Sequence, residues 1–196
     1  MPPDALDLSL NEVQTLALKA ARGAGLAWGL AEDAGRAAVW LARHAGAWAE
    51  GLPAVLDAPA ATSPLLLGGL LSDGAGEPRG AGRAAAPVWA LPGLLATGRS
   101  VLIRLDAIMV ASDPGGVPTA SAPIEDLAGL PAANLSVSFP CGKAPTLAHA
   151  LPVRFRRSRV AKADWQRLDA LAQRTYVPAS DRSRLTGAGA GLLDDE

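Results

Sequence analysis

The sequence of 196 residues predicts an α+β fold. Two segments with helical periodicity stand near the N-terminus, strand-like segments follow in the second half, and one more helical segment comes after them. Helices and strands that are segregated along a chain, rather than alternating, are typical of α+β domains. We therefore expect an N-terminal antiparallel helical hairpin, a small mixed or antiparallel sheet, and a C-terminal helix.

The first helix is expected from about residue 10 to residue 22. Ser9 and Glu12 have the spacing of a capping box, in which each side chain accepts a hydrogen bond from the backbone amide of the other residue. Apolar residues then recur at helical spacing. Gly23 is expected to end the helix, because glycine tolerates the left-handed conformation that helix ends often adopt.

The second helix is expected from about residue 30 to residue 50, where apolar residues again recur at helical spacing. A short link favours antiparallel packing of the two helices. Prolines interrupt the following segment, where we expect one or two short helices, at about 52–57 and 64–71. The glycine-rich stretch from Asp73 to Gly82 is expected to be a mobile loop.

Four later segments have the composition or alternation of strands. They are 87–91, 100–110, 134–140 and 151–160. In the last of these, Val153 and Phe155 are expected to face inward, and Arg154 and Arg156 outward. A final helix is expected at 163–175.

We expect one domain over residues 1–196. It comprises a helical part at about 8–72, a β-rich part at about 86–176, and a glycine segment at 177–196.

The charged residues are nearly balanced, with 18 Lys and Arg against 19 Asp and Glu. This balance does not favour a nucleic-acid partner. One cysteine and two histidines argue against a disulfide within the chain and against a transition-metal site. The acidic start is unlike a secretory signal, and the longest apolar run is too short to span a bilayer. We expect a soluble cytoplasmic protein with no cofactor, metal or membrane partner.

Cys141 is the strongest candidate for a catalytic group. It follows a predicted strand on a Pro-Cys-Gly turn, with Lys143 two residues later and His149 further on. A nearby ammonium group favours the reactive thiolate, and a histidine supplies a general base. The alternative is a small buried thiol beside an ordinary surface lysine and histidine.

Two regions are candidates for binding an anionic ligand. Arg154 and Arg156 lie on the outward side of a predicted strand, where they suit phosphate or carboxylate, although a solvated edge strand is the alternative. The C-terminal segment supplies the second candidate set: Tyr176, Arg182, Arg184, Gly187, Gly189 and Gly191. Its alternating glycines match neither a dinucleotide-binding loop nor a P-loop, so the segment is either an ordered lining or a flexible tail.

Three tryptophans surround the predicted hairpin, namely Trp28, Trp40 and Trp48. They form either an exposed patch for a protein partner or a second copy of the chain, or a tryptophan-rich core. His44 lies one turn from Trp40, and we expect it to be partly buried there.

Three stretches carry a resemblance to a known family. They are "LSLNEVQTLALKAARGAGLAWGLAEDAGRAAVWLA" (8–42), "SFPCGKAP" (138–145) and "TYVPASDRSRLTGAGAGL" (175–192). Together they resemble a family of small, mostly alphaproteobacterial proteins carried only as a domain of unknown function. The resemblance implies a soluble bacterial protein and supplies no reaction.

The scarcity of acid–base and metal-ligating residues favours a non-catalytic accessory subunit of a metabolic system, which binds a partner or a small anionic metabolite. The alternatives are a small enzyme that uses Cys141, and a scaffold subunit of a larger complex.

Overall fold

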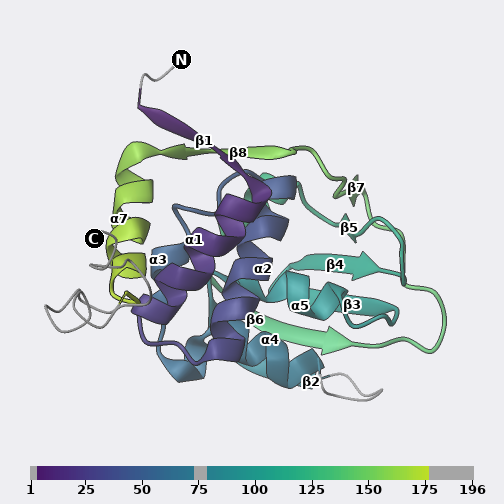
Figure 1. The fold of residues 1–196 in the computed structure, drawn as a ribbon. Coiled ribbons are helices and arrows are strands. Elements are labelled where there is room, and N and C mark those ends of the chain that lie inside the picture. Colours follow the sequence, from purple (N-terminus) through teal and green to yellow (C-terminus); the bar gives the residue numbers. More distant parts are fainter. Residues whose placement is uncertain (1–3, 73–78, 177–196) are drawn as a thin grey trace, which may run out of the picture.

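The computed structural model describes residues 4–72 and 79–176, and within them it confirms the α+β class (Figure 1). The α-helices are α1 (Leu10–Gly23), α2 (Trp28–His44), α3 (Leu52–Leu56), α4 (Pro64–Ser72), α5 (Leu91–Leu95), α6 (Ile124–Ala128) and α7 (Lys162–Gln173). Two 3₁₀ helices are η1 (Ala60–Thr62) and η2 (Pro87–Ala90). The strands are β1 (Ala5–Ser9), β2 (Arg79–Ala85), β3 (Val101–Leu105), β4 (Ile108–Ser112), β5 (Thr119–Ala120), β6 (Ala132–Ser138), β7 (His149–Ala150) and β8 (Arg157–Ala161).

The helical hairpin begins as the sequence predicts. The amide of Ser9 donates to Oε2 of Glu12 at 2.7 Å, and the amide of Glu12 donates to Oγ of Ser9 at 3.3 Å, which completes the capping box. The predicted end of the second helix at residue 50 is wrong, because α2 ends at His44. Gly46 has a φ of 83° and donates its amide to the carbonyl of Leu41, so the chain turns away there.

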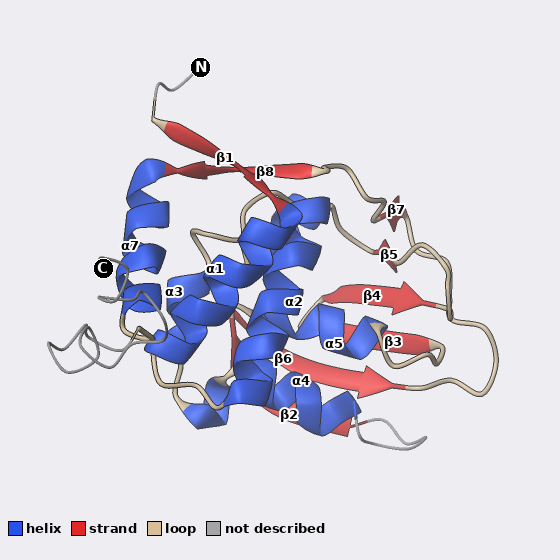
Figure 2. Ribbon diagram, in the orientation of Figure 1, coloured by secondary structure: helices blue, strands red, loops and turns tan. Residues whose placement is uncertain are grey.

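The helices form layers over the larger sheet, as Figures 1 and 2 show. Helix α1 packs against α2 on one side and against α7 on another, and α2 also contacts α4, η2 and α5. In turn, α4 packs on β2 and α5 on β3. Alanines fill much of the α1–α2 contact; those with no exposed surface include Ala17, Ala20, Ala31, Ala34 and Ala38. Small side chains let the two helices approach closely. Because α2 also contacts α4, α5 and η2, it lies between α1 and these elements.

Both sheets of the described chain are antiparallel, which agrees with the expectation of a mixed or antiparallel sheet. The larger sheet has the strand order β2-β6-β3-β4-β5-β7, and a separate pair joins β1 to β8. Alternate residues of β3 and β6 are buried, as expected for strands that cover a core with one face. The N-terminal strand β1 was not predicted, and it ties the start of the chain to the segment just before α7.

Two of the predicted strands have a different structure. Residues 87–91 form η2 and the start of α5, because prolines at 87 and 92 lack the amide that a strand ladder requires. The segment 100–110 is not one strand, since it folds into the β3–β4 hairpin. The turn is at Asp106, whose φ of 52° is favourable for few residues other than glycine, asparagine and aspartate.

Two further expectations need correction. Part of the expected glycine loop at 73–82 belongs to β2, which pairs with β6 through a register shift between Gly80 and Gly82. The predicted strand at 151–160 begins later, because β8 covers only 157–161. The predicted inward side is therefore wrong: Val153 and Phe155 are exposed, whereas Ser158 and Val160 are buried. The short helices before residue 72 and the helix α7 are confirmed.

None of the helices in the described part of the chain combines the length and the apolar character needed to cross a bilayer.

Candidate functional site

Two hollows flank the C-terminal half of α2. The first, which we call the α2–α4–α5 groove, has a volume of about 480 Å³. It is lined by Asp33, Arg36, Ala37, Val39, Trp40, Arg43, Pro64, Leu65, Gly68, Gly69, Ser72, Trp89, Ala90, Pro92, Gly93 and Ala96. The second, which we call the histidine pocket, has a volume of about 290 Å³ and is lined by His44, Pro123, Ile124, Glu125, His149, Ala150, Leu151, Pro152 and Arg154.

The histidine pocket exists because the irregular segment before β8 docks on the end of α2. The amides of Arg154 and Phe155 both donate to the carbonyl oxygen of Arg43, at 2.8 and 3.0 Å. The last carbonyls of a helix have no partner within the helix, so they accept hydrogen bonds from other segments. This contact fixes Arg154 next to His44, and it joins segments that are far apart in the sequence.

His44 is the most constrained group of this pocket. Its side chain is 6% exposed, its ring stacks on Trp40 with 4.3 Å between centroids, and its Nδ1 atom has no hydrogen-bond partner among the described residues. Burial lowers the pKa of His44 below its usual value, whereas the backbone carbonyls of Pro152 and Leu151 oppose this shift. His44 therefore lies beside tryptophan as expected, and it is buried more deeply than the expected partial burial.

Arg154 and Glu125 form an ion pair at the pocket wall. The hydrogen bond from Arg154 lowers the pKa of Glu125, and both side chains remain about half exposed. Arg154 was predicted as a ligand-binding residue and lines the pocket, together with His149. Arg156, its predicted companion, is exposed and is not part of the lining.

A metal site is not evident at this pocket. In the residues that the structure describes, no group of three or more His, Cys, Asp or Glu side chains has an arrangement that could hold a metal ion. The polar groups that line the pocket are the two imidazoles and the paired side chains of Arg154 and Glu125.

Cys141 lies on an exposed turn after β6, so the alternative of a buried thiol is wrong. The loop is held by Asp113, whose Oδ1 accepts hydrogen bonds from the Ala144 amide at 2.8 Å and from the Ser100 hydroxyl at 2.7 Å. These two bonds, together with the charge of Lys143, lower the pKa of Asp113.

His149 comes from β7, which is one edge strand of the larger sheet, whereas β6, the strand before Cys141, lies next to the other edge strand, β2. Cys141 does not line the pocket that His149 lines, and no hydrogen bond among the described residues joins the two. The catalytic roles of Cys141, Lys143 and His149 stay a prediction.

The C-terminal candidates fall largely outside the described residues. Tyr176 is exposed, and its hydroxyl accepts a hydrogen bond from Nζ of Lys19 at 2.7 Å. The other predicted residues of this segment, Arg182, Arg184, Gly187, Gly189 and Gly191, lie beyond residue 176, and their roles stay predictions.

The three tryptophans of the hairpin lie in different environments. Trp48 is fully buried, and its Nε1 donates to the hydroxyl of Ser158 at 2.8 Å, so it cannot belong to an exposed patch. Trp28 is 61% exposed and donates to Glu32, while Trp40 is partly buried at the α2–α4–α5 groove. Partner binding through Trp28 or Trp40 stays a prediction.

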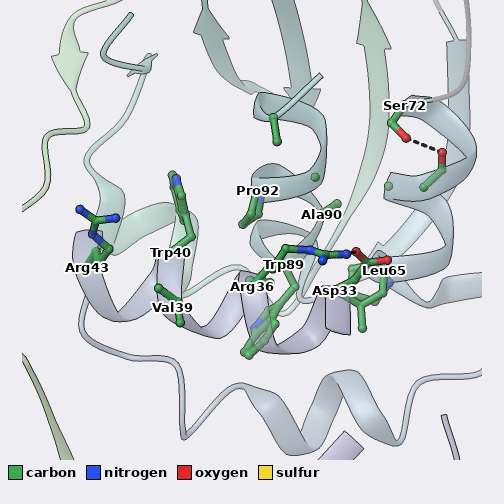
Figure 3. Close-up of a pocket in the computed structure, with 16 residues that line it drawn as sticks. Asp33, Arg36, Val39, Trp40, Arg43, Leu65, Ser72, Trp89, Ala90 and Pro92 are labelled. Carbon is green, nitrogen blue, oxygen red and sulfur yellow. Dashed lines mark hydrogen bonds and ion pairs between the residues drawn. The ribbon is translucent and has the colours of Figure 1, made fainter. Parts of the chain in front are cut away.

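Figure 3 shows how the α2–α4–α5 groove is built. Trp40 and Arg43 extend from α2 on the same side, and Trp89 and Pro92 approach from η2 and α5. Arg36 pairs with Asp33 at 2.6 Å, so its charge is largely balanced. The groove is thus an apolar channel with a basic residue near one end of α2.

Fold and hollows together define an α+β protein with two ligand-sized concavities along one central helix. Residues 8–54 match the model of a family described as "Protein of unknown function (DUF3726)". The match confirms, for this segment, the resemblance to a domain of unknown function. It includes α1, α2 and the side of both hollows that α2 contributes. Comparison with curated proteins and with solved structures gave no match to this chain.

Proposed function

We propose that this protein is a non-catalytic ligand-binding accessory module of a metabolic system, and that its histidine pocket binds a small anionic metabolite. One observation carries the proposal: both histidines of the chain line one hollow, together with an arginine that stands in an ion pair. Convergence of polar groups from separate segments on a concave surface is the usual mark of a binding site.

Arg154 supplies the main attraction for an anion. A guanidinium group presents donors in a fork that matches a carboxylate or a phosphate. Its present partner, Glu125, is about half exposed, and exposed ion pairs contribute only about 0–1 kcal/mol. The weakness of this ion pair leaves Arg154 able to turn to a ligand carboxylate, although the charge of Glu125 remains in the pocket wall.

The imidazoles add directional hydrogen bonds. His44 is held in place by the stack on Trp40 and by the end of α2, so it does not have to be ordered when a ligand binds. His149, on β7, lines the same pocket as a second polar group. Together these groups favour a compact anion over a long one, which agrees with the volume of about 290 Å³.

Calorimetric titration with succinate at low ionic strength tests this proposal. We expect saturable binding, and we expect Arg154→Gln to weaken it by about tenfold, the effect of losing a charged hydrogen bond. Arg156→Gln is the matched control, because Arg156 is two residues away and exposed but does not line the pocket. Inorganic phosphate serves as a second probe of the same chemistry.

Equal losses in Arg154→Gln and Arg156→Gln would contradict the proposal, since they would indicate a general effect of charge. Failure of both succinate and phosphate to bind the parent protein would contradict it as well.

A further inference from the structure

We infer that the α2–α4–α5 groove is a second, separate binding site, and that it takes a small amphipathic carboxylate with an acyl body. The inference does not rest on ligand binding in the histidine pocket, because the residues that would contact this ligand all line the groove.

The shape of the groove suits an apolar ligand body. Its volume of about 480 Å³ lies in the range of sites for small molecules. Two of its glycines face open space, because a Cβ atom added at Gly69 or at Gly93 would meet no atom within 4 Å. Gly68, by contrast, lies tightly against Ala90, so the wall between α4 and η2 is closed. Tight packing therefore closes one wall of the hollow, and glycines form part of a lining that also includes Trp40 and Trp89.

The charges of the groove select the head group. Three charged residues line it, and two of them, Asp33 and Arg36, neutralise each other. Arg43 takes part in no ion pair among the described residues. A groove with one unbalanced arginine is complementary to a ligand with one negative charge.

The position of Arg43 sets the orientation of the ligand. Its backbone carbonyl is fixed by the hydrogen bonds from Arg154 and Phe155, and its side chain extends beside Trp40 on the same side of α2 (Figure 3). A carboxylate at Arg43 therefore leaves the acyl chain along Trp40 toward Gly69 and Gly93. Contact with an indole ring also gives a direct optical signal.

The test is a titration of the full chain with octanoate, followed by tryptophan fluorescence and by calorimetry. We expect saturable binding that is at least about tenfold tighter than the binding of 1-octanol, the uncharged analogue. Arg43→Gln should reduce octanoate affinity toward that of 1-octanol. Arg159→Gln, an exposed arginine of β8, should leave it unchanged.

Two variants fill the groove without removing any contact. Gly93→Leu and Gly69→Leu each place a side chain in open space, and both are expected to lower octanoate affinity by more than about tenfold. Gly29→Leu is the matched control, because Gly29 also lies in a helix, faces open space and is outside the groove. Circular dichroism of each variant serves as the control for retention of its fold.

The inference would be overturned by any of three results. These are no saturable octanoate binding, equal affinity for octanoate and 1-octanol, or octanoate affinity that neither groove-filling variant lowers relative to Gly29→Leu. A groove that binds an amphipathic peptide but no octanoate would also overturn it. Loss of succinate binding in Arg154→Gln bears only on the histidine pocket, so the two proposals fail separately.

Discussion

His44 experiences two opposing influences on its charge. It is the last residue of α2, where the helix dipole favours a cation, yet its ring is almost completely buried against Trp40. Burial is the largest influence and lowers the pKa of His44, although hydrogen bonding to the backbone of Pro152 and Leu151 opposes this shift. His44 therefore binds a proton less readily in the folded protein than in the unfolded chain.

This difference predicts a loss of stability on acidification. When the pKa is lower in the folded state, the unfolded state binds more protons as pH falls through the ordinary histidine value of about 6.5, so the free energy of unfolding decreases. We expect chemical denaturation to show this decrease between about pH 7 and pH 5.5, and to show less of it in His44→Gln. His149→Gln should keep the decrease, because it leaves His44 in place. If the pH dependence of unfolding were unchanged in His44→Gln, His44 would not be the cause of the decrease.

At the scale of elements, the crossing of α1 and α7 depends on one glycine. A Cβ atom at Gly23 would lie 1.8 Å from the carbonyl oxygen of Leu171, which is a backbone atom and cannot rotate away. Gly23→Ala should therefore force the two helices apart and lower the free energy of unfolding by about 1–3 kcal/mol, as overpacked sites do. Gly29→Ala should be neutral or slightly stabilising, since it meets no atom within 4 Å and alanine favours helix. Urea denaturation of both variants measures the difference, and equal stability of the two would refute the argument.

The sequence could predict those elements whose signals are local. The helix α1 was predictable because its signals are local: the Ser9–Glu12 capping box and apolar residues at helical spacing. The strand β1 was not, since it has five residues and is defined by its pairing with β8, far away in the chain. Consecutive apolar residues at 87–91 suggested a strand, although all of 87–91 are buried together in η2 and α5, where no alternation is needed.

For the whole molecule, the candidate site depends on contacts that no local pattern records. His149 and Arg154 were found as polar residues near strand signals, but their meeting with His44 and Glu125 results from the docking of the 151–156 segment on α2. Glu125 had no sequence signal, because acidic residues such as Glu125 and Asp126 are common in the first turn of a helix. The groove was missed for the same reason: its walls are ordinary apolar helix faces.

These long-range contacts lead to a prediction about cooperativity. The two ends of the described chain are joined by the β1–β8 pair and by the α1–α7 packing, and the buried hydrogen bond from Trp48 to Ser158 connects the segment after α2 to β8. We therefore expect the chain to unfold as one domain, with tryptophan fluorescence and far-ultraviolet circular dichroism giving coincident transitions in urea. Ser158→Ala should shift both transitions together by about 1–3 kcal/mol, because it leaves the indole donor of Trp48 buried without an acceptor. Separate transitions for the two signals, or a shift in only one of them, would show that the helical part and the β-rich part fold as independent units.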